Sequence, residues 1–125
     1  MQTAGSGYFS VKVLMIVNEA PWGSTVGDTA LRMARATLTA GHELAAVFFR
    51  GEGVYHAETG RVADQGTLQP GLAWQSLSEQ DNVPLLLCSA DSQRRLSGQP
   101  ASSFREAGLP EVMSLSADCQ RVLTF

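Results

Sequence analysis

Hydrophobic residues along the chain gather in short runs that are typical of buried β-strands. Residues 11–18 (VKVLMIVN) form an almost continuous β-prone run, and residues 44–49 (LAAVFF) and 83–88 (VPLLLC) form two more. Strands that are buried on both faces of a parallel sheet show this pattern, because neither face has to be polar. We expect a last strand at residues 121–125.

Between these runs, apolar residues recur at helical spacing. The first predicted helix begins at Ser24 or Thr25 and ends at Ala40, where Gly41 suits the position just past a helix end. Its apolar stripe consists of Val26, Ala30, Met33, Ala34 and Leu38. A second helix is predicted over residues 70–80, with Leu72, Trp74 and Leu77 at helical spacing.

Shorter segments complete the prediction. Helices are expected over residues 89–96 and 109–117, and a single helical turn over residues 53–58. Residues 59–67 are expected to be loop, and residues 1–9 a flexible N-terminal extension because they are small and polar. The remaining residues, 10–125, are predicted to form one domain.

Apolar strands that alternate with helices predict an α/β fold. We expect a doubly wound, mostly parallel sheet with helices on both faces, similar to flavodoxin. In such sheets ligands bind beyond the carboxyl ends of the strands. This rule selects three segments as candidates for chemistry: residues 19–27, 50–55 and 88–95.

Composition and charge narrow the class of protein. A chain of 125 residues buries roughly two-thirds of its surface on folding, enough for one real core. The net charge is -3 and Lys12 is the single lysine, so the basic stripe of a nucleic-acid binder is missing. The first residues resemble no signal peptide, and no apolar run approaches the ~20 residues of a membrane span. We expect a cytoplasmic protein.

Cys88 is the main candidate for chemistry. It ends the third apolar run, directly before the predicted helix at residues 89–96. The positive end of that helix would favour a thiolate over a thiol, and the thiolate is the nucleophile. Arg94 and Arg95 would add positive potential. The alternative is that Cys88 is a small core residue, and Cys119, just before the last strand, is expected only to pack.

Other candidates carry weaker signals. His56 lies on a loop after a strand and either lines the Cys88 site or is a solvated loop histidine. Tyr55 and Trp22 are either exposed aromatics at a subunit interface or core residues, and Tyr55 is, like His56, a candidate supporting residue for Cys88. Residues 22–27 resemble a phosphate-binding turn at a helix start but lack the GxGxxG and Walker A spacings. Histidine and cysteine spacings typical of metal sites are missing too, so no metal site is expected.

Several motifs together resemble the DsrE/TusD family of sulfurtransferase subunits. The chain carries GHEL at residues 41–44, leading to VFF at 47–49 and GVY at 53–55. A strand ends at Cys88, with Arg94 and Arg95 a turn later. The closing CQRVLTF at 119–125 is like the family's C-x-R-V-x-x-F, and APWG at 20–23 is like its turn after the first strand. The resemblance covers most of residues 11–125.

This resemblance implies a function and a set of partners. In the family, the cysteine at the Cys88 position carries sulfane sulfur as a persulfide, without a metal or organic cofactor. The chain would then join homologous small subunits, like TusB and TusC or DsrF and DsrH, in a heterohexamer. A TusA-like protein would donate sulfur and a TusE- or DsrC-like protein accept it, for tRNA 2-thiolation or for dissimilatory sulfur oxidation.

The chain departs from the family pattern in one segment. Residues 96–104 are about a dozen residues shorter than the corresponding stretch of typical family members. Two other functions stay open from the residues alone. The chain could be a non-catalytic subunit of a small hetero-oligomer, or a flavin- or nucleotide-binding module that uses residues 22–27.

Overall fold

Strands and helices alternate along the chain, as the sequence pattern predicts. The computed structural model describes residues 10–23, 25–59 and 70–125, so the predicted extension at 1–9 and the predicted loop beyond Thr59 lie outside it. The strands of the described chain are β1 (Lys12–Val17), β2 (Glu43–Phe49), β3 (Leu85–Cys88), β4 (Phe104–Ala107) and β5 (Arg121–Thr124). Its helices are α1 (Val26–Thr39), the 3-10 helix η2 (Gly51–Ala57), α2 (Pro70–Asp81), α3 (Ser89–Arg95) and α4 (Leu109–Ala117).

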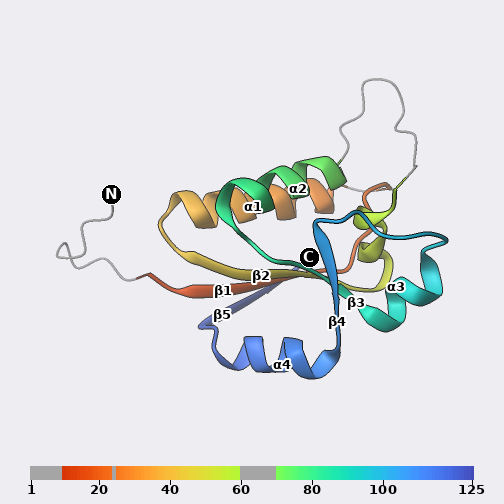
Figure 1. Cartoon of the computed structure of the whole chain (residues 1–125). Helices are drawn as coiled ribbons and strands as arrows, with labels where there is room; N and C mark the ends of the chain where they lie inside the picture. The colour runs from red at the N-terminus through yellow and green to blue at the C-terminus, as the bar shows by residue number, and fades with distance from the viewer. Residues whose placement is uncertain (1–9, 24, 60–69) are drawn as a thin grey trace.

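The described strands form one parallel sheet in the order β4-β3-β2-β1-β5. Val17 lies beside Phe49 and Phe49 beside Leu87, so β1, β2 and β3 end at the same edge. The predicted α/β fold is therefore confirmed (Figure 1). The strand order differs from that of flavodoxin, 2-1-3-4-5, because β1 to β4 lie side by side in chain order and β5 pairs with the outer side of β1.

Helices cover both faces of the sheet. α1 and α2 lie over one face and α4 over the other (Figure 1). The larger core cluster lies under α1 and α2, where the ring of Phe49 makes edge contacts with Trp74 and Phe104, each at 5.3 Å between centroids. The smaller cluster lies on the other face, where Phe48 and Leu86 pack with Val112 of α4. Adjacent Phe48 and Phe49 thus belong to opposite faces, which explains why β2 is apolar throughout.

The apolar stripes of α1 and α2 differ in part from the prediction. Met33 is 42% exposed and Leu72 is 56% exposed, so neither belongs to the core. The buried face of α1 contains Thr37, whose hydroxyl donates to the carbonyl oxygen of Met33 at 2.8 Å. That hydrogen bond satisfies the hydroxyl inside the helix and allows a polar residue on the buried side. The residues of α1 that are buried are Gly27, Ala30, Leu31, Ala34 and Thr37.

Gly41 ends α1 as predicted. Its φ is +90°, a left-handed conformation that glycine adopts without strain. The N–H of Gly41 donates to the carbonyl of Leu38 at 3.0 Å, and the N–H of His42 donates to that of Thr37 at 3.1 Å. This pair of bonds is a Schellman motif. It turns the chain directly from α1 into β2.

β4 is a strand that the sequence pattern does not predict. It contains only FREA, with Phe104 and Ala107 buried and Arg105 and Glu106 exposed. Four residues are too few for the alternation of apolar and polar side chains to identify a strand. The conformation of β4 is fixed by its pairing with β3 at the edge of the sheet. In the part of the chain that the structure describes, no helix has the length and apolar character needed to cross a membrane.

Candidate functional site

The loops that follow β1, β2 and β3 meet at the carboxyl edge of the sheet. The backbone N–H of Gly51, after β2, donates to the carboxylate oxygen Oδ2 of Asp91, after β3, at 2.7 Å. The imidazole Nε2 of His56 lies 3.0 Å from the carbonyl oxygen of Glu19, after β1. Trp22 and Tyr55 are also in ring contact, so the three segments that the sequence selects lie at one edge of the sheet.

Glycine is required where η2 crosses the end of β1. A Cβ atom on Gly53 would lie 2.1 Å from the carbonyl oxygen of Val17, which is shorter than any real contact. Gly51 has a φ of +56°, in the left-handed region. The N–H of Arg50 donates to the same Val17 carbonyl at 3.0 Å. The segment around η2 is thus held tightly over the strand end.

Cys88 stands where the sequence predicts it, at a strand end and a helix start. It is the last residue of β3 and the N-cap of α3. Its side chain is half-buried and packs beside the smaller core cluster, and it is a thiol rather than half of a disulfide. The first-turn N–H groups of a helix point toward its N-cap, and the helix dipole there favours negative charge. A partly accessible sulfur in this position is suited to nucleophilic chemistry.

Asp91 is a site residue that the sequence reasoning did not single out. Its carboxylate accepts the Gly51 N–H and also pairs with the guanidinium of Arg94. The Gly51 hydrogen bond lowers the pKa of Asp91 below its ordinary value, and the Cys88 thiol and the charges of Arg94 and Arg95 lower it further, while desolvation opposes them. The sequence signal that could have identified Asp91 is its place in the first turn after an N-cap, because acidic side chains there reach back toward the cap.

The two predicted supporting arginines have different surroundings. Arg94 lies one turn after Asp91 and forms an ion pair with it, so the carboxylate offsets much of the positive charge of Arg94. Arg95 is exposed, and its charge acts on Asp91 through space. Both lie in the last turn of α3, which is the turn farthest from the N-cap Cys88. Both arginines therefore act on Asp91, and their predicted support of Cys88 stays a prediction.

His56 is a buried residue, which excludes the solvated alternative. Only 3% of its surface is exposed, and its ring lies 5.4 Å from that of Phe49 and 6.5 Å from that of Trp74. Burial lowers the pKa of His56 to about 4, against the raising effect of the hydrogen bond to Glu19. It is a neutral packing residue beneath the loops. Its contacts are with Glu19, Gly27 and the aromatic core.

Tyr55 and Trp22 form an aromatic pair at the carboxyl edge. Their ring centroids are 5.1 Å apart with an interplanar angle of 48°. Trp22 is 44% exposed and Tyr55 is half-buried. Trp22 is therefore not a core residue, and its place at a subunit interface stays a prediction. The pair joins the loop after β1 to η2.

Two glycines of the segment that resembles a phosphate-binding turn, Gly23 and Gly27, have structural roles. A Cβ on Gly27 would lie 3.1 Å from Cε1 of His56, so the first turn of α1 closely approaches the imidazole. Gly23 has a φ of +84° and supports the turn. These contacts account for both glycines without a ligand.

Cys119 lies apart from the edge that holds Cys88. It precedes β5 at the amino edge, where its N–H donates to the carbonyl of Ser116 at 3.1 Å. The side chain is half-buried beside the smaller core cluster. Burial raises the pKa of the Cys119 thiol, although the charge of Lys12 works in the other direction. These features agree with the predicted packing role.

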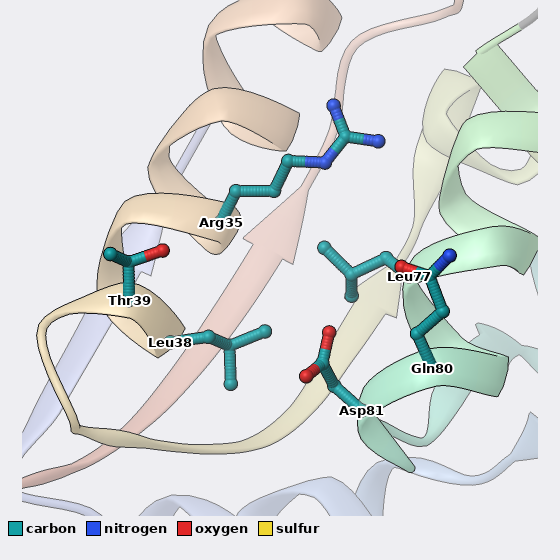
Figure 2. Close-up of a pocket in the computed structure, with 6 residues that line it drawn as sticks. All are labelled: Arg35, Leu38, Thr39, Leu77, Gln80 and Asp81. Atoms are coloured by element: carbon teal, nitrogen blue, oxygen red, sulfur yellow. The ribbon is translucent and has the colours of Figure 1, made fainter.

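A hollow of about 270 Å³ lies between the last turns of α1 and α2. Figure 2 shows the side chains of Arg35 and Leu38 from α1 and of Leu77 and Asp81 from α2 pointing into the space between the helices. None of the predicted site residues lines it. The hollow is therefore separate from the Cys88 site.

The chain belongs to the DsrE/DsrF-like family, whose model matches residues 11–125. The fold agrees with this assignment. The crystal structure of the YchN protein from E. coli superposes with a TM-score of 0.80 over 92% of this chain and 99% of that one, at 24% sequence identity. The predicted family resemblance is confirmed.

Relatives within this family are named sulfurtransferases. The chain is 35% identical to "Sulfurtransferase TusD" of Salmonella newport over 92% of this chain and all of that protein. It is also 35% identical to "Sulfurtransferase TusD homolog" of Pasteurella multocida, over 90% of this chain and 98% of the relative. The alignment with the Salmonella protein spans 130 positions, so that protein has residues where this 125-residue chain has gaps.

Proposed function

We propose that this protein is a sulfurtransferase subunit that carries sulfane sulfur as a persulfide on Cys88 and passes it from one protein to another. The observation that carries the proposal is the position of Cys88, a half-buried thiol at the N-cap of α3 and at the carboxyl edge of the sheet. The similarity to proteins named sulfurtransferase TusD over nine-tenths of the chain supports the same chemistry.

The proposed reaction consists of two thiol–persulfide exchanges. In the first, the Cys88 thiolate attacks the outer sulfur of a donor persulfide. The sulfur–sulfur bond of the donor breaks, and its electron pair leaves on the donor thiolate. In the second, an acceptor thiolate attacks the outer sulfur on Cys88 in the same way. Each step needs a good nucleophile that is also a good leaving group, which a thiolate near a helix N-terminus provides.

Protein partners suit the surface better than nucleic acid does. The net charge of -3 and the single lysine give no basic stripe for a phosphate backbone. We propose a TusA-like donor and a TusE- or DsrC-like acceptor, within a relay for tRNA 2-thiolation or for dissimilatory sulfur oxidation. A cytoplasmic location fits this role, because thiols stay reduced there.

Exposed apolar side chains support an assembly with homologous small subunits. Leu109 and Met113 of α4 are 65% and 64% exposed, and Val122 of the neighbouring strand β5 is 44% exposed. Large apolar side chains that cluster on one face are typical of protein interfaces. We propose that this α4–β5 face (Leu109, Met113 and Val122) contacts TusB/TusC- or DsrF/DsrH-like subunits in a heterohexamer. The short segment at residues 96–104 would alter acceptor recognition.

The test is the mass of the intact protein after incubation with a cysteine desulfurase and cysteine. We expect an increase of one sulfur atom that a reductant reverses. Cys88→Ser should abolish the gain, while the matched variant Cys119→Ser should keep it. A Cys88→Ser protein that still gains the sulfur would remove Cys88 from the role.

Two other functions make different predictions. A non-catalytic subunit would take no sulfur and would assemble equally well with Cys88→Ser. A flavin- or nucleotide-binding module would show a thermal shift with flavin or nucleotide, and the packing of His56 against Gly27 argues against it.

A further inference from the structure

Two aromatic side chains in ring contact lie over the carboxyl end of β1. Tyr55 follows Gly53 on η2, and Gly53 lies against the carbonyl oxygen of Val17, the last residue of β1. The ring of Trp22 lies 5.1 Å from that of Tyr55. Trp22 is 44% exposed, although its ring is one of the largest apolar groups that a protein can bury. An exposed tryptophan that a second ring supports is typical of the anchors of protein interfaces.

The aromatic pair lies at the same edge of the sheet as the reacting sulfur. Val17 and Leu87 both pair with Phe49, in register, on its two sides. Neighbouring strands are about 4.8 Å apart, so the end of β1 lies about 10 Å from the end of β3, where Cys88 follows Leu87. The helix η2, which carries Tyr55, is also hydrogen-bonded to the first turn of α3 at 2.7 Å. The pair and Cys88 are therefore parts of one surface.

A protein that delivers sulfur to Cys88 must cover this surface. The Cys88 thiolate attacks the outer sulfur of the donor persulfide, the sulfur–sulfur bond of the donor breaks, and its electron pair leaves on the donor thiolate. The outer sulfur has to approach Sγ to about 3.5 Å before it reacts. Even a small interface covers about 500 Å² of each protein, a patch about 25 Å across. Such a patch centred on Cys88 includes the end of β1 and the aromatic pair above it.

Charged side chains border the aromatic pair. Glu19 precedes Trp22 in the loop after β1, and Arg50 precedes η2, and both are exposed. Aromatic residues surrounded by a polar rim are the usual composition of a protein interface. We propose that Trp22 and Tyr55 form the docking site for the protein that delivers sulfur to Cys88. The inference rests on the proposed function.

A donor fits this position better than an acceptor or a permanent subunit. Cys88 is a thiol in the structure, and the donor docks on this sulfur-free form, whereas the acceptor docks on the loaded form. A permanently bound subunit over the aromatic pair would stand about 10 Å from Cys88 and hinder the exchange. The α4–β5 face lies elsewhere, since α4 covers one face of the sheet (Figure 1). The edge therefore suits a partner that binds and leaves.

The experiment compares a protein donor with a small one. Protein with Cys119→Ser, in which one thiol remains, is mixed with the persulfide of the TusA-like donor or with glutathione persulfide, and the loading of Cys88 is followed by intact mass. We expect Trp22→Ala to lower the second-order rate constant with the protein donor about thirtyfold, the equivalent of about 2 kcal/mol for one hot-spot residue. The rate constant with glutathione persulfide should stay unchanged, because the small donor needs no docking surface.

Two further variants serve as controls. Trp22→Phe keeps an aromatic ring beside Tyr55 and should retain most of the rate with the protein donor. Met33→Ala removes a side chain that is 42% exposed, nearly the same fraction as for Trp22, on the outer side of α1. It should leave both rate constants unchanged. Equal melting temperatures of the variants show that the fold is intact.

The outcomes separate docking from other roles of Trp22. Equal rate constants of wild type and Trp22→Ala with the protein donor would overturn the docking site and leave the persulfide function intact. An equal fall with both donors would show that Trp22 shapes the site around Cys88, and would reject the inference. Unchanged rates together with lost assembly after co-expression would make the pair a subunit interface and also reject it.

The wild-type protein distinguishes the docking proposal from the proposed function. Loading of Cys88 by glutathione persulfide but not by the donor protein would overturn the docking proposal alone. A wild-type protein that takes sulfur from neither donor would overturn the proposed function, and the docking proposal with it.

Discussion

The imidazole Nε2 of His56 lies 3.0 Å from the carbonyl oxygen of Glu19, in the loop between β1 and α1. A carbonyl oxygen only accepts, so Nε2 carries the hydrogen and donates it. The ring is nearly inaccessible and contacts Phe49 and Trp74. This bond fastens η2 to the loop after β1. It also places a titratable group where a positive charge is unfavourable.

We expect the stability of the protein to fall between about pH 6.5 and pH 4. The pKa of His56 is about 4 in the native state and 6.5 as an ordinary value, so in this range the unfolded chain binds a proton that the native protein does not. The contribution is complete above pH 6.5 and is lost as the pH falls to about 4. With about 1.4 kcal/mol per pKa unit, the loss is about 3 kcal/mol. Urea denaturation at pH 7 and pH 4 measures it.

The comparison that isolates His56 is the variant His56→Gln. It should be less stable than wild type at pH 7 because a packed ring is lost, but its stability should change less with pH. The carboxylates contribute equally to both proteins, so the difference between their pH dependences belongs to His56. Parallel curves would show that His56 does not titrate as argued.

Gly53→Ala should destabilise the fold by about 3 kcal/mol or more, at the upper end of the cost of overpacking. The new Cβ would meet the carbonyl oxygen of Val17 at 2.1 Å, and that backbone belongs to β1, which is paired on both sides and cannot move without a large cost. Gly98→Ala is the matched control, since a Cβ at Gly98 meets nothing within 4 Å among the described residues. Thermal unfolding of the three proteins gives the comparison, and equal melting temperatures would contradict the close packing of η2.

Iodoacetamide should label Cys88 before Cys119 at about pH 7.5, where the fraction of thiolate limits the rate of alkylation. Burial raises the pKa of Cys119, which leaves little thiolate there, and Cys88 is the N-cap of a helix. The single variants Cys88→Ser and Cys119→Ser each leave one thiol and allow the rates to be measured separately by mass. Faster labelling of Cys119 would favour a core role for Cys88.

Met113→Glu should prevent assembly with the homologous subunits and leave the fold unchanged. Met113 is largely exposed on the α4–β5 face, so the monomer should lose at most about 0.5 kcal/mol. A carboxylate in a buried apolar interface would lose its hydration without a partner. Size-exclusion chromatography with light scattering after co-expression measures the assembly. The control is Met33→Glu, an exposed methionine on α1 at the opposite face, which should assemble normally.

The sequence determined the layers of this protein. Runs such as LAAVFF are apolar at every position because Phe48 and Phe49 belong to cores on opposite faces of the sheet. This pattern can be read directly from the amino-acid sequence. Gly41 signalled the end of α1 because a left-handed residue is needed there. Cys88 was identified for a similar reason, since a strand end followed by a helix start is a local pattern.

Only the tertiary structure decided what surrounds Cys88. Gly51 and Asp91 are 40 residues apart, and their hydrogen bond exists because β2 and β3 are parallel neighbours that end at the same edge. The burial of His56 likewise follows from η2 folding across β1, which the loop-like sequence GEGVYHA does not reveal. β4 takes its conformation from pairing with β3. The local sequence determines which residues are apolar and where helices begin. The protonation states and contacts of the site residues depend on partners that only the completed sheet brings together.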